Sequence, residues 1–187
     1  MNFFFRKLFY RVHLFEGCSK MENDPYGIKL YHLILKEWDK FETPIFTLTT
    51  KGVKDIPLNS STVREKFPEI ISSLEKLFKD FTVFAQDNGI IVVDTKFEIF
   101  VNSKGEWILG DEILTPESSR FIADEDFQKG NYISMDKQIL RNFAKENSWK
   151  EKAKDLKSGE KLDVEVPDSI KNVILDGYET IHNRLHK

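Results

Sequence analysis

The stretch from Pro68 to about Gln86 most constrains the fold, because its apolar residues recur at the period of an α-helix. Proline suits the first turn of a helix, and Asp87-Asn88-Gly89 supplies a stop. Burying such an apolar stripe is worth about 1.5–3 kcal/mol per side chain before conformational entropy is subtracted. We therefore expect a core helix with this stripe packed against another layer: Ile70, Leu74, Leu77, Phe78, Phe81 and Phe84.

The residues after this helix predict a β-hairpin. Gly89 to Val101 opens with four consecutive apolar residues, which indicates a strand buried on both sides, and then alternates. Asn102 to Gly105 has turn composition, and Glu106 to Ile113 returns as a second strand. A four-residue connection pairs Val101 with Glu106 and hence Lys96 with Asp111.

The rest of the chain adds further elements and sets the fold class. We expect a strand over Pro44–Thr50, a helix opened by a capping box of Thr62 and Glu65, a helix from a Ser134 cap through Ala144, a helix over Trp149–Leu156 and a helix from Asp168 to about Leu185. The predicted class is α+β, an antiparallel sheet with helices packed on one side. At 187 residues the chain fits one domain, residues 1–187.

Composition excludes several classes of function. The net charge of −3 gives no global positive field for nucleic acid or an anionic membrane, and we expect neither partner. Cys18 is the only cysteine, which excludes an internal disulfide and a zinc–cysteine cage and fits a reducing cytoplasm. Met1 to Phe15 lacks the features of a signal peptide; we expect a strand with mixed faces there, with a basic transit peptide as the alternative.

A row of alternating charged residues directly follows the apolar part of the predicted buried strand. Asp94, Lys96 and Glu98 are two residues apart, so on one strand they share a face. A solvated sheet face is the ordinary explanation, but charged side chains next to a buried strand need partners. The expected hairpin register places Asp111 diagonal to Glu98 on that face, where two carboxylates could hold magnesium.

Three cations could form an anion site. Lys137 and Arg141 are four residues apart on a predicted helix and project side by side, and Ser134 stands at the start of that helix, where free amides favour an anion. Arg120 is the third cation, and we expect Arg120 and Arg141 to converge on one pocket near Lys96. Ordinary surface cations are the alternative.

Three ordered segments resemble the signature of SAICAR synthetases: Val93-Asp94-Thr95-Lys96-Phe97-Glu98, Gly110-Asp111-Glu112-Ile113-Leu114-Thr115-Pro116-Glu117-Ser118-Ser119-Arg120-Phe121 and Ser134-Met135-Asp136-Lys137-Gln138. Pro44 to Lys51 is similar to the strand before the family's central helix, and Val166-Pro167-Asp168 followed by Tyr178 is similar to its closing helix. The resemblance runs from about Arg11 to the end of the chain. In two places the sequence departs from the family pattern: Gly17-Cys18 stands for a Gly-Ser pair, and Gly52-Val53-Lys54-Asp55 for a Gly-His-Asp-Glu run.

The resemblance implies an ATP-dependent carbon–nitrogen ligase of purine synthesis with ATP and Mg²⁺ as cofactors. ATP phosphorylates the carboxylate of an aminoimidazole ribonucleotide, and the amine of aspartate displaces phosphate to give the amide. The implied roles are metal and nucleotide binding by Glu98 and Asp111, phosphate binding by Lys51, catalysis in the imidazole site by Asp94 and Lys96, and binding of substrate anions by Arg120, Lys137, Arg141 and Cys18.

The resemblance also implies an organisation and leaves two rival functions open. It covers the carboxyl-terminal, substrate- and metal-binding part of the family, so we expect the upstream ATP lobe to be absent and a separate ATP-lobe chain to be a possible partner. A homo-oligomer in the cytoplasm is expected. The chain is then either a truncated or split ligase, with little phosphoryl transfer alone, or a non-catalytic remnant that binds nucleotide or a partner; an unrelated α+β domain is the third possibility.

Overall fold

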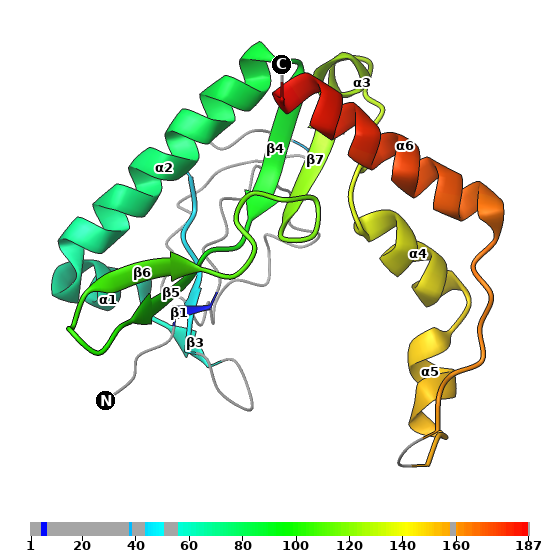
Figure 1. The fold of residues 1–187 in the computed structure, drawn as a ribbon, viewed down its shortest axis with the longest axis horizontal. Helices are drawn as coiled ribbons and strands as arrows, with labels where there is room; N and C mark the ends of the chain where they lie inside the picture. The colour runs from blue at the N-terminus through cyan, green and yellow to red at the C-terminus, as the bar shows by residue number, and fades with distance from the viewer. Residues whose placement is uncertain (1–4, 7–37, 39–43, 51–55, 158–159, 187) are drawn as a thin grey trace.

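The computed structural model describes residues 5–6, 38, 44–50, 56–157 and 160–186. The sequence predictions for Cys18 and Lys51, and for Met1–Phe15 other than β1 (Phe5–Arg6), lie outside these residues. Helices combine with small antiparallel sheets, which confirms the α+β class. In Figure 1 the central β4–β7 ribbon has α2 on its left and α4 and α6 on its right.

The helix α2 (Pro68–Asp87) is the longest of the described elements and confirms the prediction from periodicity. Proline occupies its first turn, and Asn88 caps its carboxyl end, where the Asn88 amide donates to the Ala85 carbonyl at 3.1 Å and the Gly89 amide donates to the Gln86 carbonyl at 3.0 Å. The buried positions differ in part from the predicted stripe. Phe84 is 47% exposed while the neighbouring Ala85 is fully buried. The face that meets the sheet carries Ile71, Leu74, Phe78 and Ala85.

The predicted strand Gly89–Val101 is two strands, and the prediction of a single strand is wrong. β4 (Ile90–Thr95) pairs with β7 (Ser119–Ala123), whereas β5 (Glu98–Val101) pairs with β1 and with β6 (Trp107–Gly110). The register of β4 on β7 also shifts between Val92 and Asp94. Residues 96–97 therefore connect two sheets, because β4 and β5 pair with different strands.

The β5–β6 hairpin exists, but its register differs by one residue from the prediction. Val101 pairs with Trp107 and Glu98 with Gly110. The amide of Gly105 donates to the carbonyl of Asn102 at 3.0 Å, and Gly105 has φ +82°, a conformation that glycine adopts without steric cost. The tight turn leaves Asn102 opposite Glu106, which moves every pair along the hairpin by one position.

The two-stranded sheet of β2 (Leu48–Thr49) and β3 (Pro57–Leu58) leads into the first helix. β2 is shorter than the predicted Pro44–Thr50. The helix α1 (Ser60–Lys66) begins earlier than the predicted capping box, because the Asn59 side chain accepts from the amides of Ser61 and Thr62. An asparagine side chain can satisfy two of the free amides at a helix start by itself.

The carboxyl-terminal half is mainly helical. α5 (Trp149–Lys154) and α6 (Asp168–Leu185) confirm their predictions, and α4 (Gln138–Glu146) begins four residues after the predicted Ser134 cap. Asp136 provides the acceptor there, since its carboxylate receives the Gln138 amide at 2.8 Å. The short helix α3 (Asp124–Gln128) and the strand β7 lie in a stretch whose sequence predicted no regular structure.

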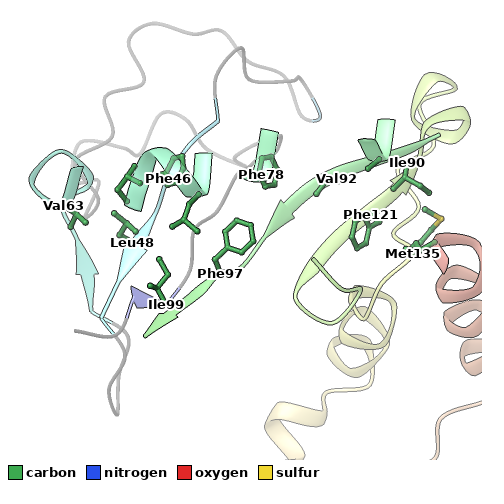
Figure 2. Packing of buried hydrophobic residues seen from close by; sticks show 14 of the residues in the cluster. Phe46, Leu48, Val63, Phe78, Ile90, Val92, Phe97, Ile99, Phe121 and Met135 are labelled. Atoms are coloured by element: carbon green, nitrogen blue, oxygen red, sulfur yellow. The ribbon is translucent and has the colours of Figure 1, made fainter. Parts of the chain in front are cut away.

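One hydrophobic core joins these elements. Figure 2 shows it extending from Val63 and Leu48, through Phe97 at the strand crossing, to Phe121 and Met135 beside the carboxyl-terminal helices. Phe97 and Phe121 are 1% and 0% exposed. Phe97 lies between Lys96 and Glu98, and Phe121 pairs with Val92 on β4, so their burial anchors the chain next to the charged row. No helix in the described part of the chain is long and apolar enough to span a membrane.

The different exposure of Phe78 and Phe84 on α2 allows a direct test of which side chains of this helix belong to the core. Phe78→Ala should lower the free energy of unfolding by roughly 3–5 kcal/mol, because Phe78 is 1% exposed and its removal leaves a cavity. Phe84→Ala is the matched control on the same helix and should change it by less than about 0.5 kcal/mol. Urea unfolding measures both, and equal losses would contradict the assignment of Phe84 to the exposed side.

Candidate functional site

The first charged residue of the row makes a cross-strand pair. Asp94 on β4 lies opposite Arg120 on β7. Arg120 Nε donates to Asp94 Oδ1 at 2.9 Å, and Arg120 Nη2 donates to Asp94 Oδ2, so the contact is bidentate. Asp94 is only 5% exposed. Burial lowers the pKa of Arg120, but the hydrogen bonds and charge of Asp94 outweigh this effect, and the guanidinium stays charged.

The other two charged residues meet at the start of the hairpin. Lys96 Nζ lies 2.8 Å from Glu98 Oε1 and 2.7 Å from Asp111 Oδ2. Glu98 is almost completely buried, whereas the Asp111 side chain is 40% exposed. Burial lowers the pKa of Lys96, but its bonds to Asp111 and Glu98 offset this and raise the pKa above the usual value.

Asp111 reaches this cluster through its backbone conformation rather than through the predicted register. Glu98 pairs with Gly110, so a continued strand would turn Asp111 to the opposite face. Instead β6 ends at Gly110, and Asp111 has φ +63°, in the left-handed region. This conformation re-aims the carboxylate toward Lys96. The prediction of the register is wrong, yet Glu98 and Asp111 still face a common cation.

The two carboxylates suit a hard cation. Their oxygens converge on the ammonium of Lys96, and oxygen donors are what magnesium prefers, with water and phosphate completing its shell. In the described ranges, no group of three or more His, Cys, Asp and Glu side chains is arranged to hold a metal ion. An ion held by Glu98 and Asp111 would therefore take the rest of its ligands from water or from a bound anion.

A second polar cluster joins three elements beside the first. Glu117 lies in a compact turn, closed by bonds from the amides of Ser118 and Ser119 to the Thr115 carbonyl at 3.0 and 2.8 Å. The Tyr178 hydroxyl of α6 donates to Glu117 Oε1, and Lys137 Nζ lies 3.4 Å from Glu117 Oε2. The hydrogen bond from Tyr178 is the main cause that lowers the pKa of Glu117, and Lys137 and Arg141 add to it.

The predicted convergence of Arg120 and Arg141 stays a prediction. Arg120 is committed to Asp94, and Arg141 is exposed on α4 with Nη1 3.5 Å from Gln138 Oε1. Arg120 also lines a mainly apolar cavity of about 510 Å³ between the β4–β7 ribbon, α4 and α6. Trp38 and Tyr132 stack at its wall with ring centroids 4.4 Å apart.

Three residues of this region were not candidates from sequence. Asp136 is fully buried and accepts from the backbone amide of Phe121 at 3.1 Å, and burial raises its pKa. Glu117 and Asp136 stood inside the quoted signature without a role, and Tyr178 was noted only for its similarity to the family's closing helix. Glu117 and Asp136 carried a usable signal, as acidic residues next to the candidates Arg120 and Lys137 in the signature segments.

Comparison with solved structures identifies the class of protein that has this fold. The chain superimposes with a TM-score of 0.64 on the SAICAR synthase from Saccharomyces cerevisiae complexed with SAICAR, at 27% identity, over 97% of this chain and 60% of that one. A SAICAR synthetase in complex with ADP is 20% identical with a TM-score of 0.58, which shows the fold alone.

Sequence comparisons give the family. The model for SAICAR synthetase matches residues 21–156. The phosphoribosylaminoimidazole-succinocarboxamide synthase of Komagataella pastoris is 34% identical over 83% of this chain and 53% of its own length. That of Lachnospira eligens is 37% identical over 65% of this chain and 46% of its own length. The chain belongs to the SAICAR synthetase family, and it spans about half the length of the curated relatives it matches.

The bidentate pair gives a prediction for stability. Asp94→Asn should cost about 1–3 kcal/mol, because it removes the charge and one acceptor oxygen from the largely buried Arg120. Asp80→Asn is the control, because it breaks an exposed ion pair: the side chain of Asp80 is 59% exposed and that of its partner Lys76 is 77% exposed. This change should lower the free energy of unfolding by less than about 0.5 kcal/mol. Chemical denaturation checks both; equal costs would show that the Asp94 pair is no more than a surface contact.

Proposed function

We propose that this chain forms the substrate- and metal-binding part of an ATP-dependent ligase that joins aspartate to a carboxylated aminoimidazole ribonucleotide. The observation that carries the proposal is the Lys96 ammonium lying between Glu98 and Asp111. Lys96 and Glu98 belong to the first signature segment and Asp111 to the second, and the chain belongs to the SAICAR synthetase family. The names of its relatives supply the reaction: synthesis of phosphoribosylaminoimidazole-succinocarboxamide.

In this proposal Glu98 and Asp111 hold magnesium, which would neutralise phosphate charge when bound. Lys96, which bonds to both carboxylates, would face the same phosphates and adds a positive charge to the site. Phosphoryl transfer depends mainly on positioning and on charge neutralisation, so a rigid set of opposite charges is the protein's principal contribution. The buried side chain of Glu98 provides that rigidity.

The remaining roles concern the ribonucleotide. Arg120, already oriented by Asp94, presents its guanidinium at the wall of the cavity beside β7. A planar guanidinium binds a carboxylate or phosphate through paired hydrogen bonds, which lysine reproduces poorly. Lys137, directly before α4, and Arg141, on α4, are proposed to bind further substrate anions, while Lys51 on nucleotide phosphate and Cys18 on substrate remain predictions from the resemblance.

A second candidate is binding without turnover by this chain alone. The chain spans about half the length of its relatives, and two carboxylates leave most of the magnesium shell to water and phosphates. Transfer requires the reacting groups to be held within about 1 Å of their productive positions. A chain that binds nucleotide but gains turnover only when the preceding half of a relative is added would be one part of a split enzyme.

Magnesium-dependent nucleotide binding tests the proposal. Mg·ADP binding, measured by isothermal titration calorimetry, should weaken about tenfold or more in Asp111→Asn, since a neutral amide binds the ion poorly. The control Asp155→Asn changes an exposed residue at the end of α5 and should bind as the unchanged protein does.

Turnover is measured separately, as formation of the aspartate-linked product from ATP, aspartate and the carboxylated ribonucleotide. Product formed by the chain alone, or after addition of the upstream half of a relative, would support the ligase. Magnesium-independent ADP binding that Asp111→Asn leaves unchanged would overturn the metal assignment. Binding with no product in either arrangement would favour the non-catalytic remnant.

A further inference from the structure

The helix α6 packs unusually close to the segment before α4. Gly177 is buried, and a Cβ at this position would lie 3.1 Å from both Cα and the carbonyl oxygen of Met135. Met135 is itself fixed to β7, because its amide donates to the Phe121 carbonyl at 2.9 Å. The carboxylate of Asp136 accepts the Phe121 amide in return. The glycine therefore lets α6 dock against a segment that is rigidly tied to the site.

The next residue of α6 reaches into the second polar cluster. The Tyr178 hydroxyl donates to Glu117 Oε1, and Glu117 Oε2 faces Lys137 Nζ at 3.4 Å. Lys137 directly follows Asp136 and directly precedes α4. A continuous chain of contacts therefore connects β7 to Lys137, by way of Met135, α6, Tyr178 and Glu117. Lysine has a long flexible side chain, so a fixed carboxylate beside it reduces the freedom that it must lose on binding.

We propose that Tyr178 is a positioning residue for the anion site, in which it holds Glu117 so that Glu117 orients Lys137 beside Arg141. The group bound there is a phosphate or carboxylate of the substrate. This last statement rests on the proposed function, whereas the link from Tyr178 to Lys137 does not. The lowered pKa of Glu117 supports the link, because the carboxylate stays ionised at neutral pH and attracts the ammonium.

Chemical labelling tests the link without any need for activity. The rate of Lys137 acetylation by acetic anhydride, measured by peptide mass spectrometry, reports how firmly its ammonium is held. In Tyr178→Phe the rate should rise toward that of Lys150, which is exposed on α5. Glu117→Gln should act in the same way. Thr180→Val removes another hydroxyl of α6, one that donates to the Asp176 carbonyl of the same helix, and should leave the rate unchanged.

Ribonucleotide binding tests the consequence. Tyr178→Phe should weaken binding of the aminoimidazole ribonucleotide about fivefold, the effect of losing one hydrogen bond's net contribution. In the background of Lys137→Met the same change should have no further effect, because the residue acts through Lys137. A purely structural role would lower the melting temperature and act equally in both backgrounds.

The outcomes separate the two proposals. If Lys137 labelling is the same in Tyr178→Phe and Glu117→Gln as in the unchanged protein, the positioning role is overturned, whatever the chain binds. If labelling rises but ribonucleotide binding is unaffected, Lys137 is positioned for something other than this anion, and the inference fails in that part. If the unchanged protein does not bind the ribonucleotide, the proposed function fails. The labelling result still decides whether Tyr178 positions Lys137 through Glu117.

Discussion

The pairing of Asp94 with Arg120 is the interaction on which the rest of the site depends. An ionised carboxylate that is 5% exposed is costly unless it is paired and hydrogen-bonded. The pair joins β4 to β7 at the point where the strand register shifts. It thereby fixes the end of β4, from which Lys96 and the hairpin continue, and it holds the guanidinium at the wall of the cavity.

Beyond this pair, a lysine faces carboxylates in two further clusters, one with a buried carboxylate and one at the surface. Lys96 balances the buried Glu98 and the exposed Asp111, and Lys137 faces Glu117. Each cluster takes its members from separate elements, so each also ties a loop to the core. In this way the charged residues that the proposed chemistry needs also connect the hairpin, the start of α4 and, through Tyr178, α6. Conformational strain is visible at Asp111, whose positive φ is of the kind found at functional sites.

Periodicity predicted the helices well and the strands less well. α2 and α6 follow from apolar spacing together with the start and stop residues, because those signals are local. The division of Gly89–Val101 into two strands was not predictable, because a strand's partner is decided by distant residues. The strand β7 was missed for the same reason: Ser119–Ala123 is short, and it becomes a strand by pairing with β4.

The sequence by itself determined the α+β class, the family resemblance and the identity of the candidate residues, from Asp94 to Arg141. Those features depend on residue type and spacing along the chain, which the sequence contains completely. Only the tertiary structure decided which charges meet: Asp94 with Arg120, and Lys96 with both Glu98 and Asp111. A one-residue change in hairpin register and one positive φ reverse the direction of a side chain, and both result from packing and turn geometry that no local pattern specifies.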